Sequence, residues 1–175
     1  ALAIAEAVFG PDHPNVGIRV NNLGLVLQTL GDYAGAKAAF ERALAIDEAV
    51  FGPDHPNVGR DVNNLGMVLN ALGDHVGAKA AYERVLAIIE KVSGPDHPNI
   101  ATLVNNLGSV LHDLGDHTGA KAAYDRALAI DEAVFGPDHP NVGRDVNNLG
   151  MVLNALGDHA GAKAAFERAL AIDEA

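Results

Sequence analysis

Pairs of adjacent asparagines recur along the chain, and their side chains are well suited to hydrogen-bond another molecule. The string Asn-Asn-Leu-Gly begins at Asn21, Asn63, Asn105 and Asn147, with a constant spacing of 42 residues. A carboxamide both donates and accepts hydrogen bonds, so a row of asparagines could hold a polypeptide backbone whatever its side chains. The first asparagine of each pair could instead tie neighbouring helices together, and both roles stay open.

Two arginines near the asparagine pairs could anchor an acidic ligand. Arg60 and Arg144 each precede a pair by three residues, and a guanidinium binds a carboxylate through two hydrogen bonds. Thirteen residues before each arginine the chain carries an aspartate, Asp47 or Asp131. The matching positions elsewhere are uncharged at both places: Ala5 with Ile18, and Ile89 with Thr102. Because the charges occur together, the sequence predicts two ion pairs, which would leave each arginine a weaker ligand anchor.

The eight histidines raise the question of a metal site. Four of them lie one per repeat in the string Pro-Asp-His-Pro, too far apart to share metal–nitrogen bonds of about 2 Å. A denser cluster contains His112, Asp113, Asp116 and His117. Its two histidines stand on either side of a predicted break between helices, so we interpret the cluster as solvated surface. We expect no metal and no cofactor.

The residue inventory argues against an enzyme. Serine occurs only at Ser93 and Ser109 and cysteine is absent, so no nucleophile stands beside a base in a recognisable arrangement. The recurring Gly-Pro-Asp-His-Pro lacks the Gly-Lys-Ser/Thr ending of a phosphate-binding loop. The lack of cysteine also excludes disulfides and cysteine-ligated zinc.

The charge and the hydropathy pattern narrow the choice of partners. Twelve Lys and Arg against 23 Asp and Glu give a formal net charge of −11, and the basic residues are spread evenly. Such a surface disfavours nucleic acid. No apolar run approaches the ~20 residues that span a bilayer, and the N-terminus does not look like a signal peptide. We therefore expect a cytoplasmic protein with neither a nucleic-acid nor a membrane partner.

The candidate residues belong to a repeat of 42 residues that accounts for the chain. The string Gly-Pro-Asp-His-Pro-Asn begins at Gly10, Gly52, Gly94 and Gly136. We expect a single array that starts with the end of a preceding helix at residues 1–9. Three whole repeats and a shortened fourth follow: 10–51, 52–93, 94–135 and 136–175.

Each repeat should contain two helices. In the first repeat, apolar residues spaced by three and four predict a helix over about 13–30, with Asp12 as its N-cap and Pro14 in its first turn. Its apolar stripe consists of Val16, Val20, Leu23, Leu27 and Leu30. A second helix should run from an N-cap at Asp32 to about Phe51, where Gly52 and Pro53 end it. Its stripe consists of Ala36, Phe40, Ala43 and Val50.

Neither helix buries its apolar stripe alone, but stacked pairs do. The pattern therefore favours an all-α solenoid. Gly24 and Ala36 are small enough to let the two helices of the first repeat approach closely.

The repeat resembles the tetratricopeptide repeat family over the whole chain. The resemblance rests on Leu-Gly in the first helix followed by small and aromatic residues at fixed places in the second: Leu23, Gly24, Ala36, Phe40 and Ala43. The later repeats carry the pattern at Leu65, Gly66, Ala78, Tyr82 and Val85; Leu107, Gly108, Ala120, Tyr124 and Ala127; and Leu149, Gly150, Ala162, Phe166 and Ala169.

The unit is longer than the usual 34 residues of that family, and this form is similar to the repeats of kinesin light chains and of bacterial signalling NTPases. It departs from the family pattern in its glycines early in the first helix, at Gly17, Gly59 and Gly143. The resemblance implies a right-handed α-solenoid of antiparallel helix pairs, a tetratricopeptide-like superhelix.

The resemblance also implies a non-catalytic scaffold for protein–protein interaction, in which the first helices line a concave groove for a peptide. On a helical wheel the asparagine pairs and the residues at positions 18, 25 and 29 point away from the apolar stripe. The predicted peptide contacts are Asn21, Asn22, Leu25, Arg60, Asn63, Asn64, Met67, Asn105, Asn106, Ser109, Arg144, Asn147, Asn148 and Met151. The alternative is an architectural spacer or self-assembling segment of a larger signalling protein.

The two ends of the chain bear on self-association. A solenoid needs polar caps, because its end units otherwise expose apolar faces. The first residues are apolar and in mid-helix, including Leu2, Ile4, Val8 and Phe9, and the chain lacks a C-terminal capping helix. The sequence therefore predicts head-to-tail association between copies, a contact that need not close into a ring.

Overall fold

The first helix of each repeat begins at a proline. The computed structural model describes residues 2–95 and 97–174, and these helices are α2 (Pro14–Thr29), α4 (Pro56–Ala71), α6 (Pro98–Asp113) and α8 (Pro140–Ala155). Proline suits this place because the first turn of a helix needs no backbone N–H. The prediction of a helix over about 13–30 is confirmed.

A histidine caps each of these helices, so the prediction of Asp12 as the N-cap is wrong. Nδ1 of His13 accepts the backbone N–H of Asn15 at 3.1 Å, and the ring stacks on Phe9 with 4.8 Å between ring centroids. The imidazole therefore satisfies a free N–H while its face covers the end of the preceding helix. The same cap recurs at His55, His97 and His139.

The second helices are α3 (Tyr33–Phe51), α5 (His75–Ser93), α7 (His117–Phe135) and α9 (His159–Asp173), and α1 (Leu2–Phe9) precedes them. Asp32 caps α3 as predicted, with its Oδ1 accepting the backbone N–H of Gly35 at 2.9 Å. Gly52 ends the helix with a φ of 84°, a left-handed conformation that only glycine adopts without strain. The predicted limits of this helix are confirmed.

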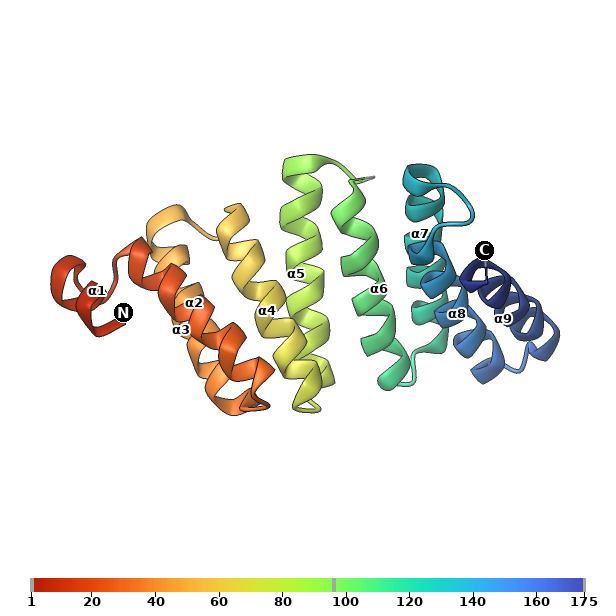
Figure 1. Ribbon diagram of the computed structural model, residues 1–175, viewed down its shortest axis with the longest axis horizontal. Helices are drawn as coiled ribbons and strands as arrows, with labels where there is room; N and C mark the ends of the chain where they lie inside the picture. Colours follow the sequence, from red (N-terminus) through yellow and green to blue (C-terminus); the bar gives the residue numbers. More distant parts are fainter. Residues whose placement is uncertain (1, 96, 175) are drawn as a thin grey trace. The chain divides into compact units, whose positions relative to one another are not determined.

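The helices form two compact units, α1 to α5 and α6 to α9. Within each unit consecutive helices run antiparallel, and the first helices of neighbouring repeats touch, α2 with α4 and α6 with α8 (Figure 1). The architecture is an all-α solenoid of stacked helix pairs, with no strand among the residues that the structure describes.

The interior follows the predicted stripes only in part. Val16 and Phe40 are fully buried, and Phe40 packs with Val68 of the next repeat. A Cβ at Gly24 would lie 2.6 Å from Cε1 of Phe40, so glycine is required for this close packing of α2 on α3. Leu30, by contrast, is 75% exposed. The predicted burial is also wrong for Leu23 and Val50.

No helix within the described ranges combines the length and apolar character that a bilayer crossing requires.

Candidate functional site

The predicted peptide contacts all lie on the first helices of the repeats. Because α2 touches α4, and α6 touches α8, side chains from adjacent repeats are neighbours within each unit. We call the side of these helices that bears positions 18, 25 and 29 of the first repeat, and their equivalents, the outer face. The wheel prediction that this side points away from the core can be tested residue by residue.

The non-asparagine positions of the outer face are accessible. Leu25 is 40% exposed and Met151 is 43% exposed, whereas Met67 and Ser109 are half-buried. Large apolar side chains that remain open to solvent are suited to bury part of a partner. The remaining outer positions are also exposed: Ile18, Thr29, Ala71, Thr102, Asp113 and Ala155.

The asparagine pairs divide between the outer face and the interior. Asn22 and Asn147 are exposed, and Asn63, Asn106 and Asn148 are half-buried. The outward placement is wrong for the other three asparagines, whose side chains are at most 7% exposed: Asn21, Asn64 and Asn105.

The buried asparagines link the first helices of adjacent repeats. Nδ2 of Asn64 on α4 donates to Oδ1 of Asn21 on α2 at 2.9 Å. In the second unit, Nδ2 of Asn148 donates to Oδ1 of Asn105 at 3.1 Å. A carboxamide pairs with a copy of itself as readily as with a peptide, so the sequence alone could not distinguish the two partners. The alternative that the first asparagine ties helices together therefore holds for Asn21 and Asn105.

Both predicted ion pairs are confirmed. Nη2 of Arg60 lies 3.1 Å from Oδ2 of Asp47, and Nη2 of Arg144 lies 3.4 Å from Oδ2 of Asp131. The arginine side chains keep about 40% of their surface exposed while the aspartates are buried. Each guanidinium therefore bridges the interior and the outer face.

A second buried carboxylate completes each ion pair, and sequence reasoning missed it. Oδ1 of Asp61 accepts from Nε of Arg60 at 2.9 Å and from Nη2 at 2.8 Å. Oδ1 of Asp145 likewise accepts from Nε and Nη2 of Arg144, and it also accepts from Nδ2 of Asn105. The sequence carries only a partial signal, since the third repeat has Leu103 in place of Asp61 but the first repeat has Arg19 there.

Burial raises the pKa of Asp61 to about 6, because the carboxylate loses its water. The hydrogen bonds and the charge of Arg60 act against this rise, and the nearby Asp47 adds to it. One oxygen of each aspartate has no hydrogen-bond partner, Oδ1 of Asp47 and Oδ2 of Asp61. Asp145 has its pKa raised to about 6 for the same reasons.

The histidine cluster also departs from expectation. His112 and His117 are half-buried, and their Nδ1 atoms lie 3.2 Å apart, so the interpretation as solvated surface is wrong for these two rings. Among the described residues, no group of three or more acidic, histidine or cysteine side chains is arranged to hold a metal ion.

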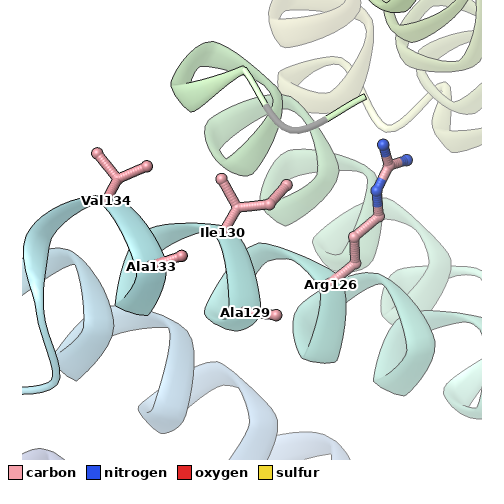
Figure 2. A pocket seen from close by; sticks show the side chains of 5 residues that line it. All are labelled: Arg126, Ala129, Ile130, Ala133 and Val134. Carbon is pink, nitrogen blue, oxygen red and sulfur yellow. The ribbon is translucent and has the colours of Figure 1, made fainter. Parts of the chain in front are cut away.

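A hollow of about 200 Å³ lies on the second helix of the third repeat. Figure 2 shows the residues that line it, all from α7: Arg126, Ala129, Ile130, Ala133 and Val134. It is open and mainly apolar. None of the predicted peptide contacts lines it.

The comparisons with known proteins agree on the repeat. A family model described as "Tetratricopeptide repeat" matches residues 1–49, 18–75, 61–111 and 100–175. No curated protein sequence matches the chain significantly.

Solved structures share the fold. The crystal structure of BtubC (BKLC) from P. vanneervenii is 27% identical with a TM-score of 0.86, and the match covers 93% of this chain and 65% of that one. The chain therefore spans just under two thirds of that protein's length. A putative kinesin light chain from Podosopora anserina with nearly identical TPR-like repeats is 22% identical with a TM-score of 0.85, covering 98% of this chain and 82% of that one.

Proposed function

Because the chain belongs to the tetratricopeptide repeat family, we propose that it is a non-catalytic scaffold that binds a peptide segment on its outer face. Repeats of this family are generally protein-interaction scaffolds. The proposal goes further in assigning the surface and the kind of ligand. The cytoplasmic location that we expect from the lack of a long apolar run and of a signal-peptide pattern belongs to the same proposal.

The exposed apolar residues of the outer face carry the proposal. Ile18, Leu25 and Met151 each keep at least 40% of their surface in water although other apolar residues of the same helices are fully buried. Clusters of such side chains gain free energy when a partner covers them, by about 25 cal/mol for each Å² of apolar surface buried. A peptide lying across α2 and α4, which touch, would cover Ile18 and Leu25 together with the half-buried Met67.

Polar contacts would come from the asparagines that remain accessible. Asn22 and Asn147 are exposed, so each can donate to and accept from a peptide backbone. Asn63, Asn106 and Asn148 are half-buried and would contribute with whatever surface they retain. Asn21, Asn64 and Asn105 support the ligand only indirectly, by fixing the spacing of the first helices.

Arg60 and Arg144 would give the face a preference for acidic ligands. Each guanidinium is partly exposed but already bonded to two aspartates. Its Coulomb attraction for a further carboxylate is therefore reduced by the charges that it already balances. We expect the arginines to tune the choice of peptide rather than to supply most of the affinity.

Selection from a displayed peptide library, followed by affinity measurement, tests this function. The Asn147→Ala, Met151→Ala variant removes two exposed side chains of α8, and the Asn22→Ala, Leu25→Ala variant does the same on α2. Each should weaken binding of a selected peptide by about tenfold or more, if these residues are central contacts.

The matched control is a Lys163→Ala, Glu167→Ala variant, which removes an exposed pair from the second helix of the same repeat. It should bind as the unchanged chain does. Equal affinities for all three variants, with unchanged helix content by circular dichroism, would rule out the outer face as the docking surface.

A self-assembling repeat segment is the second candidate, and a separate observation favours it. Phe166 of α9 is 38% exposed, whereas the aromatic residues at the matching positions are at most 2% exposed: Phe40, Tyr82 and Tyr124. At the other end of the chain Ile4 and Val8 are also exposed. A second copy of the chain would cover these surfaces in the way that successive repeats cover one another.

A further inference from the structure

Two histidines meet at the turn between α6 and α7. Nδ1 of His112 lies 3.2 Å from Nδ1 of His117, and the ring centroids are 4.9 Å apart. Without a metal, one ring must carry its hydrogen on Nδ1 and donate it to the other. If that hydrogen moved to Nε2, as in the acceptor ring, both Nδ1 atoms would offer a lone pair to the space between the rings.

The separation fits two bonds to one metal ion. Imidazole nitrogen binds zinc at about 2.0–2.1 Å, and other divalent first-row metals bind at similar distances. Two such bonds to nitrogens 3.2 Å apart enclose an angle of about 100°. This angle lies between the right angle of square-planar or octahedral coordination and the tetrahedral angle.

The backbone is fixed on both sides of the histidine pair. The carbonyl of His112 accepts the N–H of Gly115 at 2.9 Å, which closes the end of α6. Asp116 then caps α7 through a 2.9 Å bond from the N–H of Gly119 to its Oδ1. Because both helix ends are fixed, a metal ion would find the two donors already close together, which lowers the entropy lost on binding.

The other repeats show that this pairing is specific to the third. Where the third repeat has two histidines, the second has Asn70 with His75 and the fourth has Asn154 with His159. In both, Nδ1 of the histidine lies within 2.9 Å of the asparagine oxygen, which offers a metal only a weak neutral donor. The fold therefore accepts either residue, and only one repeat brings two imidazoles together.

We propose that His112 and His117 form a binding site for a divalent transition-metal ion, with Cu²⁺ bound most tightly. Imidazole suits copper, nickel and zinc, and the Irving–Williams order places Cu²⁺ first. Since the described residues offer no third ligand in this group, water fills the remaining positions and the ion exchanges freely. This site is independent of the proposed peptide-binding face and of its test.

Titration of the full chain with Cu²⁺, followed by calorimetry and electron paramagnetic resonance, tests the site. We expect one site stronger than the background of the single histidines, with a spectrum that reports two equivalent nitrogens. His112→Asn recreates the pair of the second and fourth repeats, so it should keep its fold and lose at least about tenfold in Cu²⁺ affinity. His117→Tyr introduces the residue that the first repeat has at this position, Tyr33, and should weaken Cu²⁺ binding to the same extent.

Asn154→His is the matched gain-of-site variant, since it places a second histidine pair at the turn between α8 and α9. It should bind a second Cu²⁺ with an affinity similar to the first. The proposal would be overturned if the unchanged chain and His112→Asn bound the same number of ions with the same affinity. A spectrum that shows a single nitrogen ligand would also overturn it. Failure of Asn154→His to add a site would also count against it.

Discussion

At the scale of single residues, the third repeat replaces a complete set of buried charges. Arg60 contacts both Asp47 and Asp61, and the aspartates have less than 2% of their surface exposed. Ile89, near the end of the second repeat, and Thr102 and Leu103 of the third stand at the equivalent positions. Removing only one charge would leave the others buried without balance, which is far more costly than removing all of them.

Arg60→Thr alone should therefore lower the free energy of unfolding by about 2 kcal/mol. This loss is smaller than is usual when one partner of a buried ion pair is removed, because the arginine is partly exposed. The triple variant Asp47→Ile, Arg60→Thr, Asp61→Leu copies the third repeat and should recover most of that loss. Urea denaturation of both variants checks this. A triple variant no more stable than Arg60→Thr would mean that the third repeat depends on compensating residues elsewhere.

Asp61 and Asp145 should make stability depend on pH. The raised pKa of Asp61, about 6 against an ordinary 3.8, means that the folded chain holds a proton that the unfolded chain releases. Between these values the folded state binds more protons, so the contribution of Asp61 to the free energy of unfolding falls as the pH rises, and the penalty is complete above pH about 6. Asp145 contributes in the same direction.

The Asp61→Asn, Asp145→Asn variant removes both titrations. Its stability relative to the unchanged chain should increase as the pH rises from about 4 to about 7, because only the unchanged chain must lose buried protons. The new carboxamides could also donate to the neighbouring carboxylates, one of which has an unpartnered oxygen at Asp47. Thermal unfolding across this pH range measures the difference. Parallel stability profiles would exclude the raised pKa values.

Sequence comparison predicts a paired charge better than it predicts a paired amide. Asp47 and Arg60 were identified because charges cannot be buried singly, so they change together between repeats. The comparison is less clear at the position of Asp61, which holds Leu103 in the third repeat but Arg19 in the first. Asn64 offers no such signal, because asparagine occupies its position in every repeat and its partner, Asn21, is equally invariant along the chain.

At the scale of helices, proline and glycine predict the boundaries well. Proline restricts the backbone and glycine frees it through their own covalent structure, so their effect on a helix end does not depend on distant residues. The cap falls on His13 because Pro14 is the first helical residue, and His97 caps α6 in the same way although Ser93 stands there in place of the aromatic residue. Local propensity favours aspartate as an N-cap, and the position set by the proline outweighs that preference here.

Glycines within the first helices should respond to alanine according to what faces them. A Cβ at Gly59 would meet Cγ2 of Ile88 at an ordinary 3.5 Å, and the third repeat already carries Ala101 there. Gly59→Ala should raise the free energy of unfolding by up to about 1 kcal/mol through helix propensity. A Cβ at Gly108 would lie 2.8 Å from Cε1 of the buried Tyr124, so Gly108→Ala should lower it by about 1–3 kcal/mol.

Chemical denaturation of the two glycine variants provides the comparison, and each serves as the control for the other. Both gain the same helix propensity, so the difference between them isolates the contact with the aromatic ring. If both were stabilised, the packing between α6 and α7 would have to be looser than the structure has it.

At the scale of the whole molecule, surfaces that are covered between internal repeats are open at α2 and α9. Val26 of α2 is 55% exposed, whereas the valines at the matching positions of α4, α6 and α8 are fully buried. Phe166 of α9 lacks the cover that Phe40 receives from Val68. If α9 of one copy packed on α2 of another, it would reproduce this internal contact. The first turn of α1 would have to move to make room for it.

This contact joins two different surfaces, so a third copy can add to the second and the association should not stop at a dimer. Light scattering should show an average mass that rises with concentration. Val26→Glu places a charge in the contact and should hold the chain as a monomer, whereas Ala80→Glu, at an exposed position of α5, should change nothing. Val26 lies outside the predicted peptide contacts, so this variant should keep its peptide affinity, which separates assembly from ligand binding as uses of the array.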